Sequence, residues 1–494
     1  MPAFSLAPEQ VSWCADLRAL AVERLRPLAE KGEPGRVNRP LLAELGRLGL
    51  LDRLFASGAL DLCLMRESLA HGCTEAETAL ALQGLGAHPV HAHGTPAQRA
   101  RWLPPVTRGE AVAAFALSEP GAGSDAAALS LRAEPDGSGA AAADGRRAER
   151  YDLPAAPGGL RAAPDWPPAA PDGLRAEPDE LRGDLGDLRA EPGGLQAEPG
   201  DLRAEPGGGV PSTAGPTPEA PSPEGLSPKG PSPSGPAPRS AAALAAVPEG
   251  ARRWRLTGEK CWISNAPEAD VYTVFARTTP GAGSRGVTAF LVPADRPGLT
   301  GSALDMLSPH PIGALDFDGV PVTADDVLGE PDRGFRVAMG TLNLFRPSVG
   351  AFALGMAQAA LDATVAHTAR REAFGGRLSD LQTVAHQVAE MALRTEAARL
   401  MVYAAATAYD ERAPDVPRRA AMAKLLATET AQYVVDAAVQ LHGARALRRG
   451  HLLEHLYREV RAPRIYEGAS EVQRAVIAKE LYAASRPHAA EEAE

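Results

Sequence analysis

The sequence lacks several features that mark secreted or membrane proteins. No run of about 18 apolar residues stands out along the 494-residue chain, so we expect no membrane-spanning helix. The segment from Met1 to Leu20 shows no basic stretch followed by an apolar one, so we expect no secretory signal there. These absences predict a cytoplasmic protein that works away from the membrane.

Cysteine, lysine and basic clusters are scarce as well. The four cysteines lie far apart and form no CxxC pair, which argues against a zinc ribbon or a disulfide scaffold and fits a reducing compartment. They are Cys14, Cys63, Cys73 and Cys261. The formal net charge is −11 and no basic cluster is present, so nucleic acid is not an expected partner. Lysine supplies only 5 of the 51 basic residues, a bias to which we attach no functional weight.

Proline and glycine, by contrast, are in excess at 45 and 49 residues, and the excess is local. Residues 131–250 contain 22 of the prolines and 19 of the glycines, with only two aromatic residues, Tyr151 and Trp166. The same segment carries 11 basic and 19 acidic residues, and therefore most of the net negative charge. The globular part of the chain is reduced to the remaining 374 residues.

A seven-residue repeat lies within this segment. Near copies of Leu-Arg-Ala-Glu-Pro begin at Leu174, Leu188, Leu195 and Leu202, the third with Gln in place of Arg. Each copy carries a proline, which costs about 3 kcal/mol inside a helix, so a coiled coil is excluded. We expect a disordered insertion at about 132–250, because it cannot bury enough apolar area to offset its ordering entropy. Leu131–Asp136 resembles a first copy, which suggests tandem duplication; an inert loop and a partner-binding arm both stay open.

Apolar periodicity divides the rest of the chain into three parts. We expect an N-terminal helical domain at 1–112, a middle β domain at 113–331 that the insertion interrupts, and a C-terminal helical bundle at 332–486. Residues 487–494 are expected to be a disordered tail. Gly94-Thr95-Pro96 predicts a helix start, since a threonine cap precedes a proline in the first turn.

The most informative stretch is Ala116–Asp125, where a β run ends in Ser118 and Glu119 and a glycine-rich turn follows. Glycines let a backbone approach a planar or phosphorylated ligand closely, and serine can donate a hydrogen bond to phosphate. The string Pro-Gly-Ala-Gly-Ser recurs at 280–284, where we interpret it as a hairpin turn. What distinguishes the first copy is its context, with Ser118 and Glu119 before it and Asp125 after it.

Four further motifs follow along the chain. Gly258–Asn265 contains Trp262 and Ser264, which could stack on and hydrogen-bond to a flat heterocycle, although a buried tryptophan in a β core explains the motif on its own. The others, each of which alone could be bundle surface or a helix cap, are Arg371–Gly375 with Leu381-Gln382, Val439–Gly443 and Arg464–Arg474.

Together, in this order and spacing, the five motifs resemble the acyl-CoA dehydrogenase family over essentially the whole chain outside residues 131–250. The resemblance implies a fold that is mainly α with a β middle domain. An N-terminal α domain, a small β-barrel-like domain and a C-terminal four-helix bundle would follow one another, with FAD between the last two. No metal is implied.

The resemblance also implies which residues bind the flavin. Leu117 and Ser118 would bond the pyrimidine edge of the ring, Ser124 would lie near the pyrophosphate and the substrate, and Ser264 would lie near N5. The full set on this side is Phe115, Leu117, Ser118, Gly123, Ser124, Trp262, Ile263, Ser264, Ala469 and Glu471. Residues that would reach the FAD of a neighbouring subunit, and so imply a homodimer or homotetramer, are Arg371, Phe374, Gln382, Gln440, Leu441 and Gly443.

Glu467 falls on the position of the family's catalytic base, within Tyr-Glu-Gly. The implied reaction converts an acyl-CoA to the trans-2-enoyl-CoA, with Glu467 taking the α-proton and flavin N5 accepting the β-hydride. Burial would raise the pKa of the carboxyl group and strengthen the base. Some family members carry the base on an earlier helix, at the position of Phe345 here, which cannot act as one. Substrate contacts are implied for Ser124, Asn343, Arg346 and Gly468.

The sequence departs from the family pattern at several points. Gly443-Ala-Arg-Ala446 replaces Gly-Gly-x-Gly, Ala469 replaces a frequent threonine, and Asn343 stands where an acid is common. Residues 52–60 also lack the usual loop of proline and paired glycines that helps to shape the acyl pocket. Acyl chain length and branching are therefore not predicted.

Several alternatives stay open at this point. Electrons are expected to pass to an electron-transfer flavoprotein, but an oxygen-using acyl-CoA oxidase or an enzyme for carrier-protein thioesters would share these motifs. A flavin monooxygenase is disfavoured because it needs no base such as Glu467. A non-catalytic interaction protein, with residues 131–250 as its working part, is a distant third. His88, His91 and His93 lack a matching acid or cysteine for a metal site, and Lys260 is interpreted as a solvated strand end.

Overall fold

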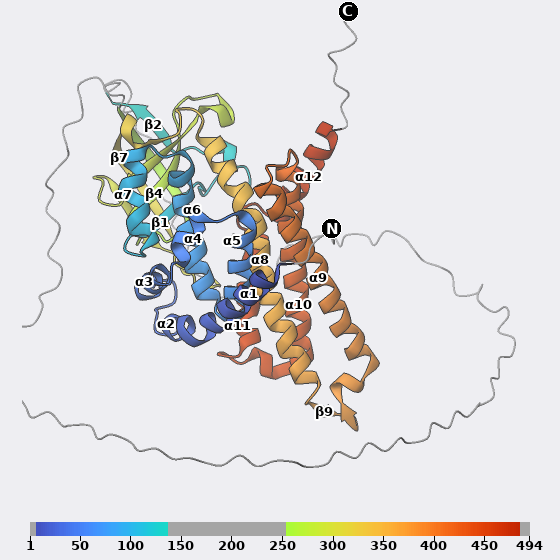
Figure 1. Ribbon diagram of the computed structural model, residues 1–494. Helices are drawn as coiled ribbons and strands as arrows, with labels where there is room; N and C mark the ends of the chain where they lie inside the picture. Colours follow the sequence, from blue (N-terminus) through green and yellow to red (C-terminus); the bar gives the residue numbers. More distant parts are fainter. Residues whose placement is uncertain (1–5, 137–252, 485–494) are drawn as a thin grey trace, which may run out of the picture. The chain divides into compact units, whose positions relative to one another are not determined.

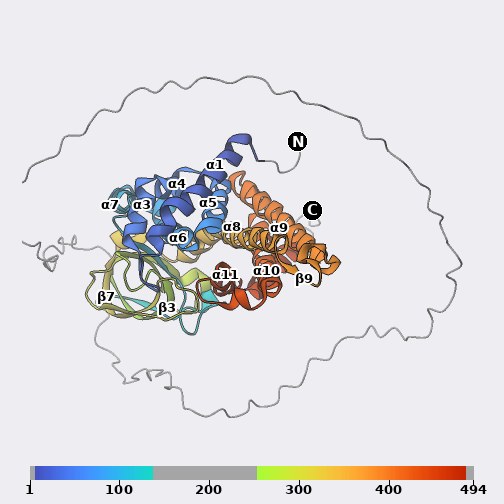
Figure 2. The same ribbon diagram turned by 90° about the horizontal axis from the view of Figure 1, so that it is seen from below.

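The computed structural model describes residues 6–136 and 253–484, and its first part is helical (Figures 1 and 2). Seven α-helices and one π-helical turn precede the first strand. They are α1 (Pro8–Leu20), the π-helical turn (Ala21–Leu25), α2 (Arg26–Ala29), α3 (Arg39–Arg47), α4 (Leu50–Ala56), α5 (Ala59–Gly72), α6 (Thr74–His93) and α7 (Pro96–Thr107). The helical character expected for the N-terminal part is confirmed.

Local sequence signals explain where some of these helices begin. Thr95 caps α7 reciprocally: its hydroxyl accepts from the backbone N–H of Gln98 at 3.2 Å, and the Gln98 amide oxygen accepts from the N–H of Thr95 at 2.8 Å. Asn38 caps α3 by accepting from the N–H of Leu41 at 3.0 Å. These side chains satisfy donors that a helix leaves unpaired at its start, so the predicted boundary at Thr95 is confirmed.

The middle part is one eight-stranded mixed sheet. Its strands are β1 (Ala113–Ala116), β2 (Arg132–Pro135), β3 (Arg253–Ser264), β4 (Val271–Arg277), β5 (Val287–Pro293), β6 (Leu299–Ala303), β7 (Ile312–Thr323) and β8 (Val327–Leu328). The order is β6-β7-β3-β2-β4-β5-β8, with β1 added parallel to β4. The sheet curls on itself in Figure 2, in agreement with the barrel-like middle domain implied by the resemblance.

Strand β2 corrects the predicted start of the insertion. The expected boundary at about residue 132 falls inside a strand that pairs antiparallel with β3, from Arg132 opposite Thr257 to Pro135 opposite Trp254. The first copy of the repeat is thus part of the sheet. The expectations of disorder and of tandem duplication for later copies lie outside the described residues, as does the expected C-terminal tail.

The C-terminal part is a helical bundle. Its long helices are α8 (Gly334–Thr368), α9 (Gln382–Asp410), α10 (Val416–His442) and α12 (Ser470–Ala484). Helix α10 packs against the other three, and α8 also packs against α9. The short elements are the hairpin β9 (Glu372–Ala373) and β10 (Gly376–Arg377), and α11 (Leu452–Glu459). The predicted bundle is confirmed.

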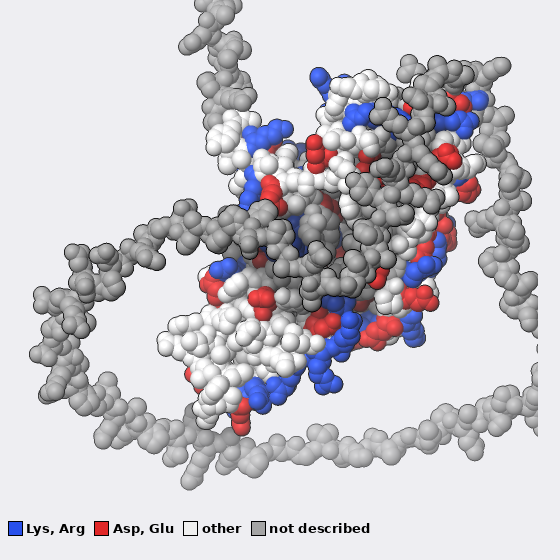
Figure 3. Space-filling model, turned by 180° about the vertical axis from the view of Figure 1, so that it is seen from behind, with Lys and Arg blue, Asp and Glu red and all other residues white. Residues whose placement is uncertain are grey.

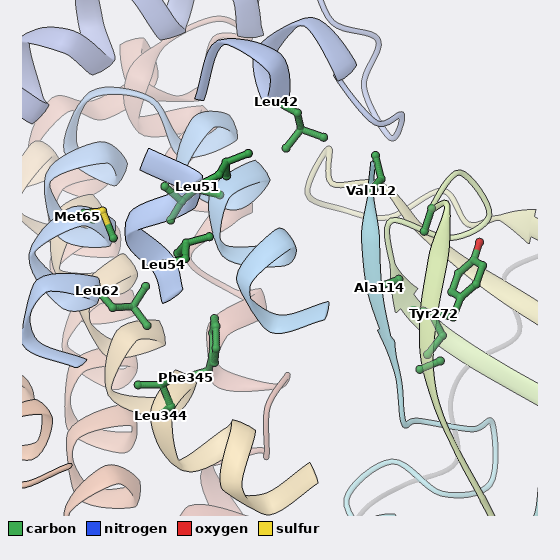
Figure 4. Close-up of a cluster of buried hydrophobic side chains, with 14 of the residues drawn as sticks. Leu42, Leu51, Leu54, Leu62, Met65, Val112, Ala114, Tyr272, Leu344 and Phe345 are labelled. Carbon is green, nitrogen blue, oxygen red and sulfur yellow. The ribbon is translucent and has the colours of Figure 1, made fainter. Parts of the chain in front are cut away.

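Helix α8 is long and apolar enough to cross a membrane by length and composition alone, with a mean hydropathy of 1.4 in its most apolar window. However, 72% of that window is buried within the protein, as is typical of a core helix in a bundle, so the expectation of no membrane-spanning helix stays a prediction. In Figure 4, Leu344 and Phe345 extend from α8 toward the helices that carry Leu54 and Leu62.

Glycine at position 86 allows α6 to lie directly against β1. A Cβ atom there would lie 2.6 Å from the carbonyl carbon of Ala113 and 2.6 Å from the nitrogen of Ala114, and backbone atoms cannot swing aside. We expect Gly86→Ala to destabilise the fold by about 1–3 kcal/mol and to lower the Tm measured by thermal unfolding. Gly340→Ala in α8 is the control, because a Cβ there meets nothing within 4 Å. An equal loss in both variants would contradict the close-packing argument.

Charged side chains of both signs lie interspersed on the part of the surface visible in Figure 3. Local ion pairs also occur among the described residues, for example Asp415 with Arg418 at 2.6 Å and with Arg419 at 2.8 Å. Such exposed pairs add little to stability, about 0–1 kcal/mol each.

Candidate active site

The glycine-rich loop after β1 is open at its tip. Glu119 and Ala122 exchange backbone hydrogen bonds of 3.3 and 3.1 Å, which closes a tight turn. Gly121 and Gly123 are exposed, and a Cβ on either would meet nothing within 4 Å. Ser124 is exposed as well. The loop therefore leaves room for a ligand to approach its backbone.

Behind this loop lies a buried ion pair that corrects the expectation for Lys260. The residue was expected at a solvated strand end, but it is fully buried. Its Nζ donates to the Leu117 carbonyl at 2.9 Å and to Oε1 of Glu119 at 2.8 Å. The Glu119 carboxylate also accepts from the backbone N–H groups of Ser130 at 2.5 Å and Leu131 at 3.0 Å. Lys260 and Glu119 thus fix the segment that leads into the loop.

The electrostatics of this pair follow from its burial. Burial lowers the pKa of Lys260 to about 8, although the nearby Glu119 carboxylate opposes that shift. Burial alone would raise the pKa of Glu119, but Lys260 and the backbone donors hold it below its usual range. Both groups are therefore charged at neutral pH, and the charge of each favours the charged form of the other.

The loop and the second motif lie side by side, since the N–H of Cys261 donates to the carbonyl of Ser118 at 3.0 Å. Between Lys260 and Ile263 the register of β3 against β7 shifts, so that β3 bulges. Trp262 at the bulge has φ of 57° and is 48% exposed, while Ile263 is buried and Ser264 half-buried. The alternative of a buried tryptophan in the β core is therefore wrong.

Glu467 lies in a sharp turn before α12. Both Glu467 and Gly468 have positive φ, 53° and 97°. The carbonyl of Glu467 accepts from Nε of Arg346 at 3.3 Å and from Nε2 of Gln473 at 3.2 Å. Its carboxyl Oε2 is buried without a hydrogen-bond partner among the described residues. A buried carboxylate oxygen with an open acceptor is suited to receiving a proton.

The surroundings of Glu467 tune its acidity. Burial raises the pKa of Glu467, and three cations oppose that rise: Arg66 on α5, Lys424 on α10 and Arg346 on α8. The Glu467 carboxyl group therefore combines a raised pKa with nearby positive charge. Of these three cations, Arg346 is a predicted site residue, whereas Arg66 and Lys424 were not predicted from the sequence.

Arg66 belongs to a buried polar cluster from the N-terminal domain. It is 3% exposed, its Nε pairs with Glu77 of α6, and its Nη1 donates to Ser348 of α8 at 2.7 Å. Phe345, the residue on α8 at the position where some other family members carry the base, is 2% exposed and packed into the core. Asn343 accepts from Nη1 of Arg346 at 3.4 Å.

Comparisons with known proteins identify the family. Models of the N-terminal, middle and C-terminal domains of acyl-CoA dehydrogenases match residues 7–110, 235–320 and 332–482. The chain belongs to the acyl-CoA dehydrogenase family. The recognition from five motifs is therefore confirmed.

Individual members of the acyl-CoA dehydrogenase family are similar over part of the chain. It is 42% identical over 244 residues to the human mitochondrial short-chain specific enzyme, and 38% over 231 residues to a probable acyl-CoA dehydrogenase of Mycobacterium tuberculosis. These alignments cover 49% and 46% of this chain and 59% of each relative. Butyryl-CoA dehydrogenase from Megasphaera elsdenii matches in structure with a TM-score of 0.70 and 25% identity, over 97% of this chain and 99% of that one.

The remaining residues assigned by resemblance to the acyl-CoA dehydrogenase family gather at the other end of the bundle. Figures 1 and 2 place β9, next to Arg371 and Phe374, far from the sheet. The rings of His367 and His442 stack at 4.2 Å, which brings the ends of α8 and α10 together there. Phe374 is 91% exposed. The other exposed or half-buried residues of this set are Gln382, Gln440, Leu441 and Gly443.

The histidines at the end of α6 form no site of their own. His88 packs edge-on against Phe345 at 6.1 Å, and burial lowers its pKa to about 4. Within residues 6–136 and 253–484, no group of three or more His, Cys, Asp or Glu side chains could hold a metal ion.

Proposed function

We propose that this chain is an FAD-dependent acyl-CoA dehydrogenase that uses Glu467 as its catalytic base. The observation that carries the proposal is the Glu467 carboxyl group, whose Oε2 is buried without a hydrogen-bond partner in the described part of the chain and whose pKa is raised by burial. Family membership supports the reaction type, since the relatives are named as acyl-CoA dehydrogenases. The chain aligns with 59% of the length of these two curated relatives, and we propose that it shares their activity.

The residues present fit a flavin. A flat ring needs an exposed aromatic or apolar surface and backbone that can be approached closely, and Trp262 and the Gly121–Gly123 turn supply both. FAD, when bound, supplies the acceptor for a hydride. The residues that would hold it are Phe115, Leu117, Ser118, Gly123, Ser124, Trp262, Ile263, Ser264, Ala469 and Glu471.

A second subunit would complete the cofactor site. Arg371, Phe374 and Gln382 lie at the end of the bundle remote from the sheet, so they cannot reach a flavin held by Trp262 of the same chain (Figure 1). We therefore propose a homodimer or homotetramer in which these residues, with Gln440, Leu441 and Gly443, serve the neighbouring FAD. The nearly complete exposure of Phe374 supports this role.

In the proposed reaction, Glu467 removes the α-proton of the acyl thioester. The β-hydrogen departs with its electron pair as the Cα–Cβ double bond forms, which yields the trans-2-enoyl thioester. Negative charge develops on the thioester carbonyl, and we propose that the backbone N–H of Glu467 stabilises it. Asn343, Arg346, Ser124 and Gly468 are the proposed substrate contacts. The α-proton stays on the Glu467 carboxyl group, whose raised pKa favours the capture of a proton.

The names of two similar proteins point to a first substrate to test. One acts on butyryl-CoA and the other is short-chain specific, so we propose a short acyl-CoA. One similar solved structure, at 25% identity, is described as the electron transferring flavoprotein of Acidaminococcus fermentans. We propose a flavoprotein of that kind as the electron acceptor. We also propose that the protein is cytoplasmic.

Anaerobic addition of butyryl-CoA to the purified flavoprotein tests the proposal. We expect the visible flavin absorbance to bleach within seconds, and enoyl-CoA to appear in amounts equal to the bleached flavin. A panel of acyl-CoAs and acyl-carrier proteins then ranks substrates. Protein without bound flavin, or flavin that no acyl thioester bleaches, would refute the function. Peroxide formed in air at the rate of turnover would assign an oxidase instead.

A further inference from the structure

Lys424 is a second buried lysine, and it lies next to the proposed base. It is fully buried in the interior of α10, and its Nζ donates to the carbonyl of Gly468 at 2.7 Å. Burying a lysine is a costly placement, because its charge leaves water and needs a polar partner. Its partner is the residue that follows Glu467 in the turn.

This turn needs to be held in place. Glu467 has φ of 53°, a left-handed conformation that is unfavourable for a residue with a side chain. Four hydrogen bonds secure its two carbonyls. Glu467 O accepts from Arg346 and Gln473, and Gly468 O accepts from Gln473 at 2.9 Å and from Lys424. Lys424 is the donor that α10 contributes to this set.

We propose that Lys424 is a positioning residue for catalysis, which holds the Glu467–Gly468 turn in its left-handed form and keeps positive charge beside the Glu467 carboxylate. The proposal rests on the proposed function, because it assigns Lys424 a role toward the base. It goes beyond a packing role, since a neutral side chain of equal size would fill the same space.

The charged groups around Lys424 and Glu467 determine the pH dependence that the proposal predicts. Arg66 from α5 and Arg346 from α8 also face Glu467, and Glu429 and Glu471 face Lys424. Burial lowers the pKa of Lys424 to about 8, and Glu467 opposes that fall. Lys424 is therefore charged at neutral pH. Because a cation favours an ionised carboxylate, its removal raises the pKa of Glu467 and shifts base activity to higher pH.

The test follows flavin reduction by butyryl-CoA in stopped flow between about pH 5 and pH 9, the range in which carboxyl and lysine groups titrate. For Lys424→Met, we expect the acidic limb of the rate profile to move up by about one pH unit. The rate below that limb falls about tenfold, and KM changes little. Lys424→Arg keeps the charge and should keep the wild-type limb.

Controls separate this role from a structural one. Lys479→Met removes an exposed lysine on α12 and should leave the profile unchanged. If Lys424→Met does not accumulate with bound flavin, Lys424→Gln replaces it, because glutamine can still donate to the Gly468 carbonyl while carrying no charge. A wild-type limb in Lys424→Met or Lys424→Gln overturns the proposal and leaves the proposed function intact. Failure of the wild-type protein to bleach overturns the function itself.

Discussion

Replacing Glu467 with Gln is expected to slow flavin reduction by butyryl-CoA by about 10²–10⁴-fold. The amide has nearly the size of the carboxyl group, so the turn held by Arg346 and Gln473 should remain. It cannot accept the α-proton, however. Stopped-flow reduction measures the rate, and the unreduced spectrum with added substrate shows whether FAD and acyl-CoA still bind.

Two further variants make this result specific. Glu467→Asp keeps the carboxylate but withdraws it by one methylene, so we expect an intermediate rate. Glu411→Gln removes an exposed carboxylate at the end of α9 and should leave the rate unchanged. If Glu467→Gln still reduced its flavin within tenfold of the wild-type rate, another group would have to be the base.

Lys260→Met is expected to destabilise the protein by about 3–5 kcal/mol and to weaken FAD retention. The substitution leaves the Glu119 carboxylate buried without its cation, and it removes the donor that binds the Leu117 carbonyl at 2.9 Å. Since this segment precedes the glycine-rich loop, disorder in the segment should also displace the loop and weaken the binding of FAD. Thermal unfolding and the ratio of flavin to protein measure the two effects.

The double variant Lys260→Met with Glu119→Gln is the informative comparison. Removing both charges of a buried pair costs much less than removing one, because no uncompensated charge is left. We therefore expect the double variant to recover a large part of the lost stability. If it were as unstable as Lys260→Met alone, or if Lys260→Met unfolded at the wild-type Tm, the ion pair would not have the importance assigned to it.

Much of this fold follows from local sequence patterns. The spacing of apolar residues predicts the long bundle helices, and the threonine and proline at 95–96 predict the start of α7, which the Thr95–Gln98 capping pair confirms. The proposed position of the base came from the family resemblance, since Tyr-Glu-Gly alone specifies no chemistry. Helical periodicity and capping are properties of neighbouring residues, so they are visible without the fold.

The buried charges were not predictable in the same way. Lys260 and Glu119 are 141 residues apart in the sequence, and Lys424 meets Gly468 only because α10 packs against the turn before α12. An isolated lysine in a strand is usually solvated, and no local pattern marks the exception. Trp262 is exposed because β3 bulges, and no local pattern in the sequence of β3 predicts the bulge.

The pairing of β2 with β3 bears on how this chain could have grown. Pro135 lies opposite Trp254, and the N–H of Asp136 donates to the carbonyl of Arg253 at 2.9 Å, so the chain leaves and re-enters the sheet at adjacent positions of one ladder. Strands β2 and β3 are thus antiparallel neighbours in the sheet and consecutive among the described strands. In general, the closure entropy of a chain segment between two fixed ends rises only logarithmically, by about 0.6 kcal/mol for each doubling of length. A gene can therefore add or lose whole repeats at this point with little thermodynamic consequence for the catalytic fold, and the same point is a natural place to graft another domain.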